Sequence, residues 1–200
     1  MFGIDELKEV IPFPVSPRGS LDDVQWLQIF GGLGTRLPLD YVLMRKAFGE
    51  GYFFSISHKW SASLEFYDLR PQTAPNQFSA FGRLNELRIK KEKSPKSIPF
   101  PLYYEPKGLL PWGRLSNDAD ICWRVSGHLV DDWTTVLIRP ASKEHEVFEM
   151  SAVQFLARAL NGKVVSSILP AGFPGTKGVA FQPLGHPNSP PAVVQYGKSL

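Results

Sequence analysis

Glycine and proline are frequent in this chain, and their frequency limits the folds that it can adopt. Its 200 residues include 17 glycines and 18 prolines, and both residue types interrupt helices and regular strands. Such a chain favours short strands joined by loops and disfavours an all-helical bundle. Hydrophobic residues still make up 43% of the sequence and aromatic residues 12%, which is enough for a packed core. We therefore expect one folded domain of mixed structure.

Charge and cysteine content narrow the classes of function. The single cysteine, Cys122, rules out a disulfide framework and a cysteine-rich zinc site. The chain carries 22 basic and 19 acidic residues, a formal net charge of +3, which is too weak a field to indicate nucleic-acid binding. The N-terminus lacks the features of a secretory signal, and no apolar stretch is long enough to span a bilayer. We expect a cytoplasmic protein that binds neither membranes nor nucleic acid directly.

Three helices are expected before residue 50. A short one covers residues 5–10. The second begins after Ser20, a good N-cap, and ends at the glycine pair 31–32. Its apolar residues are spread widely enough for the helix to pack on two sides; they are Leu21, Val24, Leu27, Trp26 and Phe30. The third helix begins at Pro38 and is expected to bury three residues at helical spacing, namely Tyr41, Met44 and Phe48.

After Gly51 the spacing of apolar residues changes to that of strands, and an antiparallel meander is expected. Between residues 120 and 127, Ile121 and Trp123 point to one face and Cys122 to the other. The expected strands cover residues 52–56, 64–68, 120–127, 133–139 and 146–150. A capping box of Ser151 and Gln154 then starts a helix that Gly162 ends.

Two segments stand out by composition. Residues 83–96 are the most basic part of the chain and are interpreted as a solvated loop or a sheet edge guarded by lysines. Residues 170–200 are rich in proline and glycine and contain no acidic residue, which predicts an extended coil or a disordered tail. A single α+β domain is therefore expected over residues 1–169, with residues 170–200 as an extension.

Motifs for phosphate and metal binding are incomplete. Residues 31–36 and 172–178 are glycine-rich but lack the spacing of phosphate-binding loops. His145 and Glu146 match the first half of a zinc-peptidase motif, but Glu149 stands where the second histidine is needed. No metal or other cofactor is predicted.

A nucleophile with its base is also hard to find. Cys122 would need a nearby base such as His128 to form a thiolate. Its place between Ile121 and Trp123 is more typical of a packed side chain. No catalytic residue is predicted.

Four acidic residues flank the strand expected at 120–127. They are Asp118, Asp120, Asp131 and Asp132. Loops at the ends of a meander can lie together, so these side chains are the candidate partner-binding patch, suited to a basic partner. The alternative is that they form turns and have no partner.

Two blocks of sequence resemble the SUKH superfamily. The first runs from Leu37-Pro38-Leu39-Asp40-Tyr41 to Phe48-Gly49-Glu50-Gly51. The second consists of Gly108-Leu109-Leu110-Pro111-Trp112-Gly113, the acids Asp118 and Asp120, Ile121-Cys122-Trp123 and Trp133. The blocks occur in the family's order, and the resemblance covers roughly residues 20–165.

The resemblance implies an antiparallel sheet of about four to six strands, with N-terminal helices and one C-terminal helix packed against it. Bacterial members of this family are largely immunity proteins that bind a cognate toxin, and fungal relatives are regulators that act through protein interactions. It thus implies a non-catalytic module that neutralises a toxin domain by binding it; the alternative is a regulatory or scaffold protein with a cellular partner. We expect Trp112, Trp123 and Trp133 to fill the core, each with one hydrogen-bond partner, and glycines 108 and 113 to form turns around Leu109 and Leu110.

Overall fold

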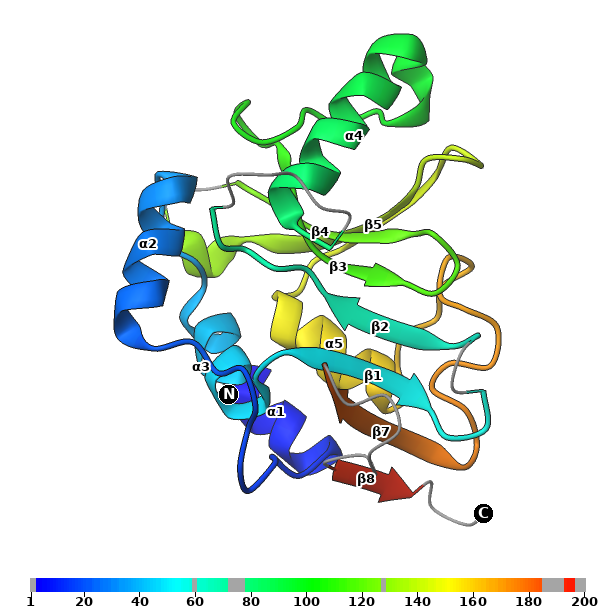
Figure 1. The fold of residues 1–200 in the computed structure, drawn as a ribbon. Coiled ribbons are helices and arrows are strands. Elements are labelled where there is room, and N and C mark those ends of the chain that lie inside the picture. Colours follow the sequence, from blue (N-terminus) through cyan, green and yellow to red (C-terminus); the bar gives the residue numbers. More distant parts are fainter. Residues whose placement is uncertain (1–2, 59–60, 72–77, 127–128, 185–192, 197–200) are drawn as a thin grey trace.

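The protein is an α+β structure built on one antiparallel sheet (Figure 1). The computed structural model describes residues 3–58, 61–71, 78–126, 129–184 and 193–196. The sheet has eight strands in the order β6-β5-β4-β3-β2-β1-β7-β8, which confirms the fold class and exceeds the four to six strands expected. The strands are β1 (Gly51–Ser55), β2 (Ser63–Phe66), β3 (Leu109–Leu115), β4 (Asp120–Arg124), β5 (Thr134–Arg139), β6 (Glu144–Phe148), β7 (Gly178–Pro183) and β8 (Val193–Tyr196).

Helices lie on both sides of the sheet, and Figure 1 shows α4 and α5 on opposite faces. On one face, α3 places Tyr41 against the rings of Trp112 and Trp123, and α1 packs against α3 and α5. On the other face, α4 is tied to β4 by an ion pair between Arg83 and Asp120. The helices are α1 (Gly3–Val10), α2 (Asp23–Leu33), α3 (Leu39–Phe48), α4 (Ala80–Lys93) and α5 (Ala152–Leu160), with short 3₁₀ turns η1 (Pro95–Ser97) and η2 (Val130–Asp132).

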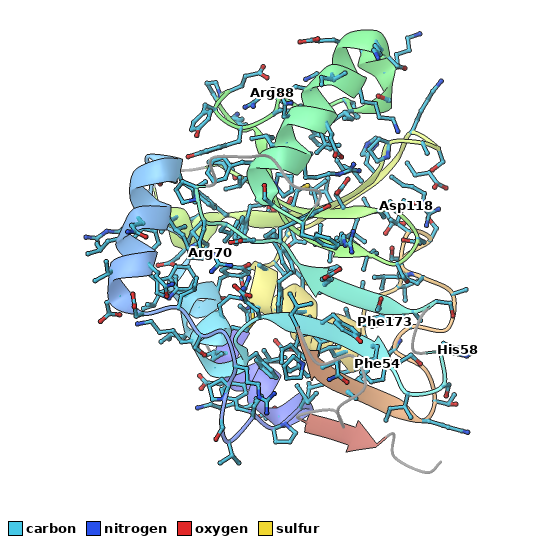
Figure 2. All side chains as sticks on the ribbon, viewed as in Figure 1. Phe54, His58, Arg70, Arg88, Asp118 and Phe173 are labelled. Carbon is cyan, nitrogen blue, oxygen red and sulfur yellow. The ribbon has the colours of Figure 1, made fainter. Side chains whose placement is uncertain are left out.

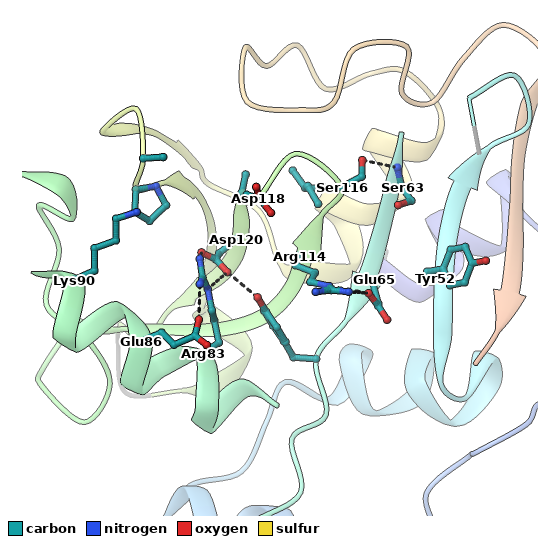
Figure 3. A pocket seen from close by; sticks show the side chains of 15 residues that line it. Tyr52, Ser63, Glu65, Arg83, Glu86, Lys90, Arg114, Ser116, Asp118 and Asp120 are labelled. Carbon is teal, nitrogen blue, oxygen red and sulfur yellow. Dashed lines mark hydrogen bonds and ion pairs between the residues drawn. The ribbon is translucent and has the colours of Figure 1, made fainter. Parts of the chain in front are cut away.

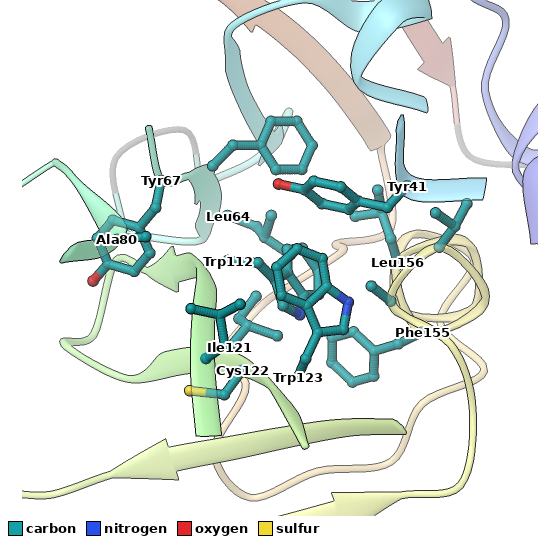
Figure 4. Close-up of a cluster of buried hydrophobic side chains, with 14 of the residues drawn as sticks. Tyr41, Leu64, Tyr67, Ala80, Trp112, Ile121, Cys122, Trp123, Phe155 and Leu156 are labelled. Carbon is teal, nitrogen blue, oxygen red and sulfur yellow. The ribbon is translucent and has the colours of Figure 1, made fainter. Parts of the chain in front are cut away.

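The apolar face of the sheet holds an aromatic core (Figure 4). The ring of Tyr41 lies 4.6 Å from that of Trp123 and 5.9 Å from that of Trp112, both edge-on. Trp133 lies 6.0 Å from Trp123, and all three tryptophans are buried as expected. The expected hydrogen bonds are wrong for two of them, because the buried indole N–H groups of Trp112 and Trp123 have no acceptor in the described part of the chain.

Local capping signals predicted α5 and α3 well. In α5, the Gln154 N–H donates to Ser151 Oγ at 3.2 Å, and the Ser151 N–H donates to Gln154 Oε1 at 3.3 Å. This is the reciprocal pair of a capping box. Helix α3 follows Pro38 and buries the three residues named for it, Tyr41, Met44 and Phe48. Both helices therefore lie where the sequence placed them.

Helix α2 starts and faces differently from the prediction. Its N-cap is Asp22, which forms a capping box with Gln25, while Ser20 donates instead to the Lys46 carbonyl. The helix buries Trp26 and leaves Val24 and Leu27 exposed. The prediction of two packed sides is therefore wrong within this chain, since the second apolar side faces solvent.

The basic segment is mostly helical, so its interpretation as a loop or sheet edge is wrong. Residues 80–93 form α4, whose N-cap Ser79 accepts from the Gly82 N–H at 2.9 Å. Its last turn carries Lys90, Lys91 and Lys93, where positive charge complements the helix dipole. The sequence analysis missed this helix because the basic residues masked its apolar side, Leu84 and Leu87.

The C-terminal extension contributes two strands to the sheet, so its prediction as coil is wrong for those residues. Strand β7 pairs with β1 over Gly51–Ser55, and its Phe181 ring packs 5.0 Å from Phe48. The sheet thus needs residues beyond 169 to be complete. The turn expected at Gly113 is wrong, because Gly113 lies within β3, whereas Gly108 directly precedes that strand.

Candidate functional site

A wide hollow lies on the polar face of the sheet, between α4 and the turns that follow β3 and β5. We call it the sheet groove (Figure 3). It is open to solvent and has a volume of about 730 Å³, which lies within the range of small-molecule sites. Its floor comes from the strands, one wall from α4, and the other end from Asp118 and residues 140–141.

The floor is a row of side chains from four neighbouring strands. Tyr52, Glu65, Arg114 and Asp120 are directly opposite one another in successive strand pairs, so they project from the same face. Arg114 donates from Nε to Glu65 Oε2 at 2.7 Å and its Nη2 lies 2.6 Å from the same oxygen. The floor therefore alternates in charge.

Asp120 is the centre of a buried ionic network, although it was predicted as a binding residue. Its carboxylate accepts two hydrogen bonds from Arg83, at 2.7 and 2.8 Å, and one from the Tyr67 hydroxyl at 2.8 Å. Arg83 also donates to Glu86 at 2.7 Å. Only 1% of Asp120 is exposed. A carboxylate held by three donors and closed to solvent anchors α4 to the sheet.

Two members of the network, Tyr67 and Arg83, have a raised pKa. Burial and the Asp120 charge raise the pKa of Tyr67, which therefore stays a neutral donor. Burial lowers the pKa of Arg83, but its hydrogen bonds to Asp120 and the charge of that carboxylate outweigh this effect and raise it. Neither Tyr67 nor Arg83 is therefore prepared to exchange a proton near neutral pH.

Cys122 lies on the same side of β4 and is fully buried. Burial, together with the nearby Asp120 charge, raises the pKa of its thiol well above 9.0. Such a thiol is a poor nucleophile. His128, the base considered for it, lies outside the described residues.

The other motifs do not form sites. His145 and Glu146 lie on strand β6, where the helical spacing of a zinc peptidase does not apply. Across the described ranges, no group of three or more His, Cys, Asp or Glu side chains is placed to hold a metal ion. The glycine-rich residues 31–36 lie at the end of α2, and residues 172–178 lead into strand β7; neither segment opens a helix toward an anion.

The four candidate acids do not form one patch. Asp118 is exposed on the turn before β4. Figure 2 labels this residue at one end of the sheet. Asp131 and Asp132 belong to η2, which follows β4 and lies at the opposite end, beside α3. Five residues of strand separate the two ends by roughly 16 Å. The prediction of a single acidic cluster is therefore wrong, and Asp120 is inaccessible.

Asp131 and Asp132 lie in a different setting, which we call the η2–α3 corner and define by Leu39, Leu43, Leu129, Asp131 and Asp132. The Leu39 N–H at the start of α3 donates to Asp131 Oδ1 at 2.9 Å, which joins η2 to the helix. The leucines are 57%, 44% and 65% exposed, respectively. These leucines were not predicted from the sequence, although Leu39 and Leu43 are four residues apart, opposite the buried Tyr41 and Met44.

Asp40 lies beneath this corner. The Ser151 hydroxyl donates to its Oδ2 at 2.7 Å, whereas its buried Oδ1 has no hydrogen-bond partner. Burial raises the pKa of Asp40 despite the hydrogen bonds from Ser151 and the Tyr41 N–H, and the charge of Asp131 adds to the increase. A carboxylate with one unbonded oxygen therefore lies beneath the η2–α3 corner.

A second, smaller hollow of about 280 Å³ adjoins the groove at Glu65. It contains Arg45, a buried guanidinium that donates to the Tyr41 hydroxyl and to the carbonyls of Gly49 and Tyr67. These contacts tie α3 to the strands. Its position among apolar helix residues gave no sequence signal.

Comparisons with protein-family models, with curated proteins and with solved structures find no match. In the part of the chain that the structure describes, no helix is long and apolar enough to cross a membrane.

Proposed function

We infer that this chain is a non-catalytic protein-binding module, and that it is an immunity protein that neutralises a toxin domain by direct binding. The SUKH resemblance supplies the expectation. The η2–α3 corner is the observation that carries the proposal. Its exposed leucines and paired acids form a surface of the kind that binds other proteins.

The corner joins apolar area to negative charge. Leu39 and Leu129 offer side chains that a partner can cover, which is the main source of affinity at protein interfaces. Asp131 and Asp132 favour a partner whose surface is positive, and complementary charge speeds encounter and selects the partner. The toxin surface expected here is therefore apolar at its centre and basic around it.

The chemistry of the groove also supports binding over catalysis. Its guanidinium groups are already paired with carboxylates, and the Cys122 thiol is buried with a raised pKa. A lone thiol also suits a reducing compartment, so the proposal places the protein in the cytoplasm of the cell that makes the toxin.

The test is capture of partners from the native cell with wild-type protein and with two charge-reversal variants. Asp132→Lys changes the corner, and Asp118→Lys is its matched control at the other end of β4. We expect the wild type and the control to retain one toxin-bearing protein, and Asp132→Lys to bind it at least about tenfold more weakly. Asp131→Lys is a poorer choice because it removes the hydrogen bond to the Leu39 N–H and costs about 1 kcal/mol of stability.

The same captured protein must then be shown to be toxic. Its expression alone should stop growth, and co-expression of wild-type chain should restore it while Asp132→Lys restores it less. Capture of a stable housekeeping complex would instead favour the regulatory or scaffold function. Equal binding by wild type and Asp132→Lys would remove the corner from the proposal.

A further inference from the structure

We propose that the sheet groove is a second binding site, for a small zwitterion that carries both an ammonium and a carboxylate group: an amino acid or a short peptide with free ends. This site is independent of the η2–α3 corner and of the immunity function. Some charged side chains of the groove are paired with one another and others are not, and this difference indicates the ligand.

Most charged side chains in the groove neutralise one another. Arg83 is shared between Asp120 and Glu86, and Arg114 is paired with Glu65. An ionic ligand that bound to these groups would have to replace a short hydrogen bond that already exists. These paired groups therefore shape the site, and the charges of the ligand must pair with other side chains.

Two charged side chains of the lining remain free. Among the described residues, neither the Lys90 ammonium nor the Asp118 carboxylate has a hydrogen bond or an ion pair, and both line the groove. Lys90 is on α4, two turns beyond Arg83. Asp118 is on the turn between β3 and β4. The groove thus offers one positive and one negative group from different walls.

A zwitterion satisfies both free charges at once. A simple anion would pair with Lys90 and leave Asp118 unmatched, and a simple cation would do the reverse. A ligand with a carboxylate at Lys90 and an ammonium at Asp118 matches both, and charge-assisted hydrogen bonds of this kind are the stronger class.

The floor between the walls suits the polar middle of such a ligand. Arg114 uses Nε and Nη2 on a single oxygen of Glu65, so within the described part of the chain Arg114 Nη1 and Glu65 Oε1 are left as a donor and an acceptor. A peptide group carries one acceptor and one donor. The hollow of about 730 Å³ is large enough for several residues of peptide, so the groove can accept a short peptide as well as an amino acid.

The test is calorimetric titration of the full chain with triglycine and with its N-acetylated and C-amidated forms. We expect triglycine to bind measurably below about 10 mM, and each blocked form to bind at least about tenfold more weakly. Glycine and tetraglycine, titrated in the same way, distinguish an amino-acid site from a peptide site. Absence of binding by all three unblocked compounds, or equal binding of the blocked and free forms, would overturn the proposal.

Matched variants place the binding in the groove. Lys90→Gln and Asp118→Asn should each weaken triglycine binding by about tenfold. Lys93→Gln removes the same charge from an exposed residue one turn further along α4 that does not line the groove, and should change nothing. Asn tolerates the positive φ of 61° at position 118, so Asp118→Asn keeps the turn. Unchanged binding in Lys90→Gln and Asp118→Asn contradicts the site, whereas the corner variant Asp132→Lys should bind triglycine normally whether or not the immunity proposal holds.

Discussion

The two faces of the same strands bury side chains by different means. On β4, Ile121 and Trp123 enter the aromatic core, while Asp120 and Cys122 face α4 on the other side. Trp123 is stabilised by packing alone, since its indole N–H has no hydrogen-bond acceptor within the described chain. Asp120 is held by three hydrogen bonds from two side chains. Both residues are almost fully buried.

The difference shows how a strand can be buried on both faces without being apolar on both. A buried carboxylate is tolerated only when donors replace the water that it loses. Arg83 and Tyr67 supply those donors, so α4 can pack over Asp120. The apolar face has no buried charges that need hydrogen-bond donors. Its stability depends on how completely its side chains fill the space and contact one another. The two faces should therefore respond differently to substitution.

The largest effect is expected on the apolar face. Trp123→Ala removes a ring that contacts Tyr41, Trp112 and Trp133, and should cost about 3–5 kcal/mol in the free energy of unfolding. The measurement is urea denaturation followed by circular dichroism. Trp123→Phe is the control: it should cost much less, because the indole N–H that it removes is unbonded. A wild-type midpoint for Trp123→Ala would show that the ring is not part of the core.

The next effect is expected on the polar face. Asp120→Ala leaves Arg83 without its main carboxylate partner and the Tyr67 hydroxyl without an acceptor, and should cost about 3 kcal/mol. The double variant Asp120→Leu with Arg83→Met removes both charges and should recover most of that loss. Denaturation of the three proteins tests this, and a double variant as unstable as Asp120→Ala would show that the unpaired charge of Arg83 is not the cause of the loss.

Regular elements with local signals were predictable from the sequence. The capping box at Ser151 and the helical spacing of Tyr41, Met44 and Phe48 gave α5 and α3 correctly, because caps and periodicity act within one turn of chain. Strand β7 was missed, because its place beside β1 depends on a pairing across more than 120 residues of sequence. The proline and glycine around it indicated coil, and only tertiary contact overrides that preference.

The candidate site was less predictable than the fold. Asp118 and Asp120 look alike in the sequence, yet one is exposed and the other is buried against Arg83. The pairing depends on α4, which the sequence analysis did not find. The distance between Asp118 and Asp131 likewise depends on which end of β4 each one flanks. Charge in the sequence predicted the residue types of a site but not their arrangement.

The smallest effect concerns a carboxyl on the helix side of the apolar face. Asp40, unlike Asp120, keeps a buried oxygen without a partner, and burial raises its pKa above the ordinary 3.8. The folded protein therefore binds this proton more tightly than the unfolded chain, so the contribution of Asp40 to stability is greatest below pH 3.8 and is lost as pH rises through the folded-state pKa. Asp40→Asn keeps an acceptor for the Ser151 hydroxyl and removes the charge.

Asp40→Asn should thus be more stable than the wild type at pH 7 and equal to it near pH 3. Denaturation midpoints at several values of pH measure the difference, which should grow as pH rises between these limits. Asp131→Asn is the companion variant: it removes the neighbouring charge that adds to the pKa of Asp40, so in its background the difference should be smaller and should level off at a lower pH. A gain in stability for Asp40→Asn that does not vary with pH would mean that the gain comes from packing. Asp40 has an unbonded oxygen and Asp120 is fully hydrogen-bonded, and this contrast would then not explain how the two sides of the sheet tolerate buried charge.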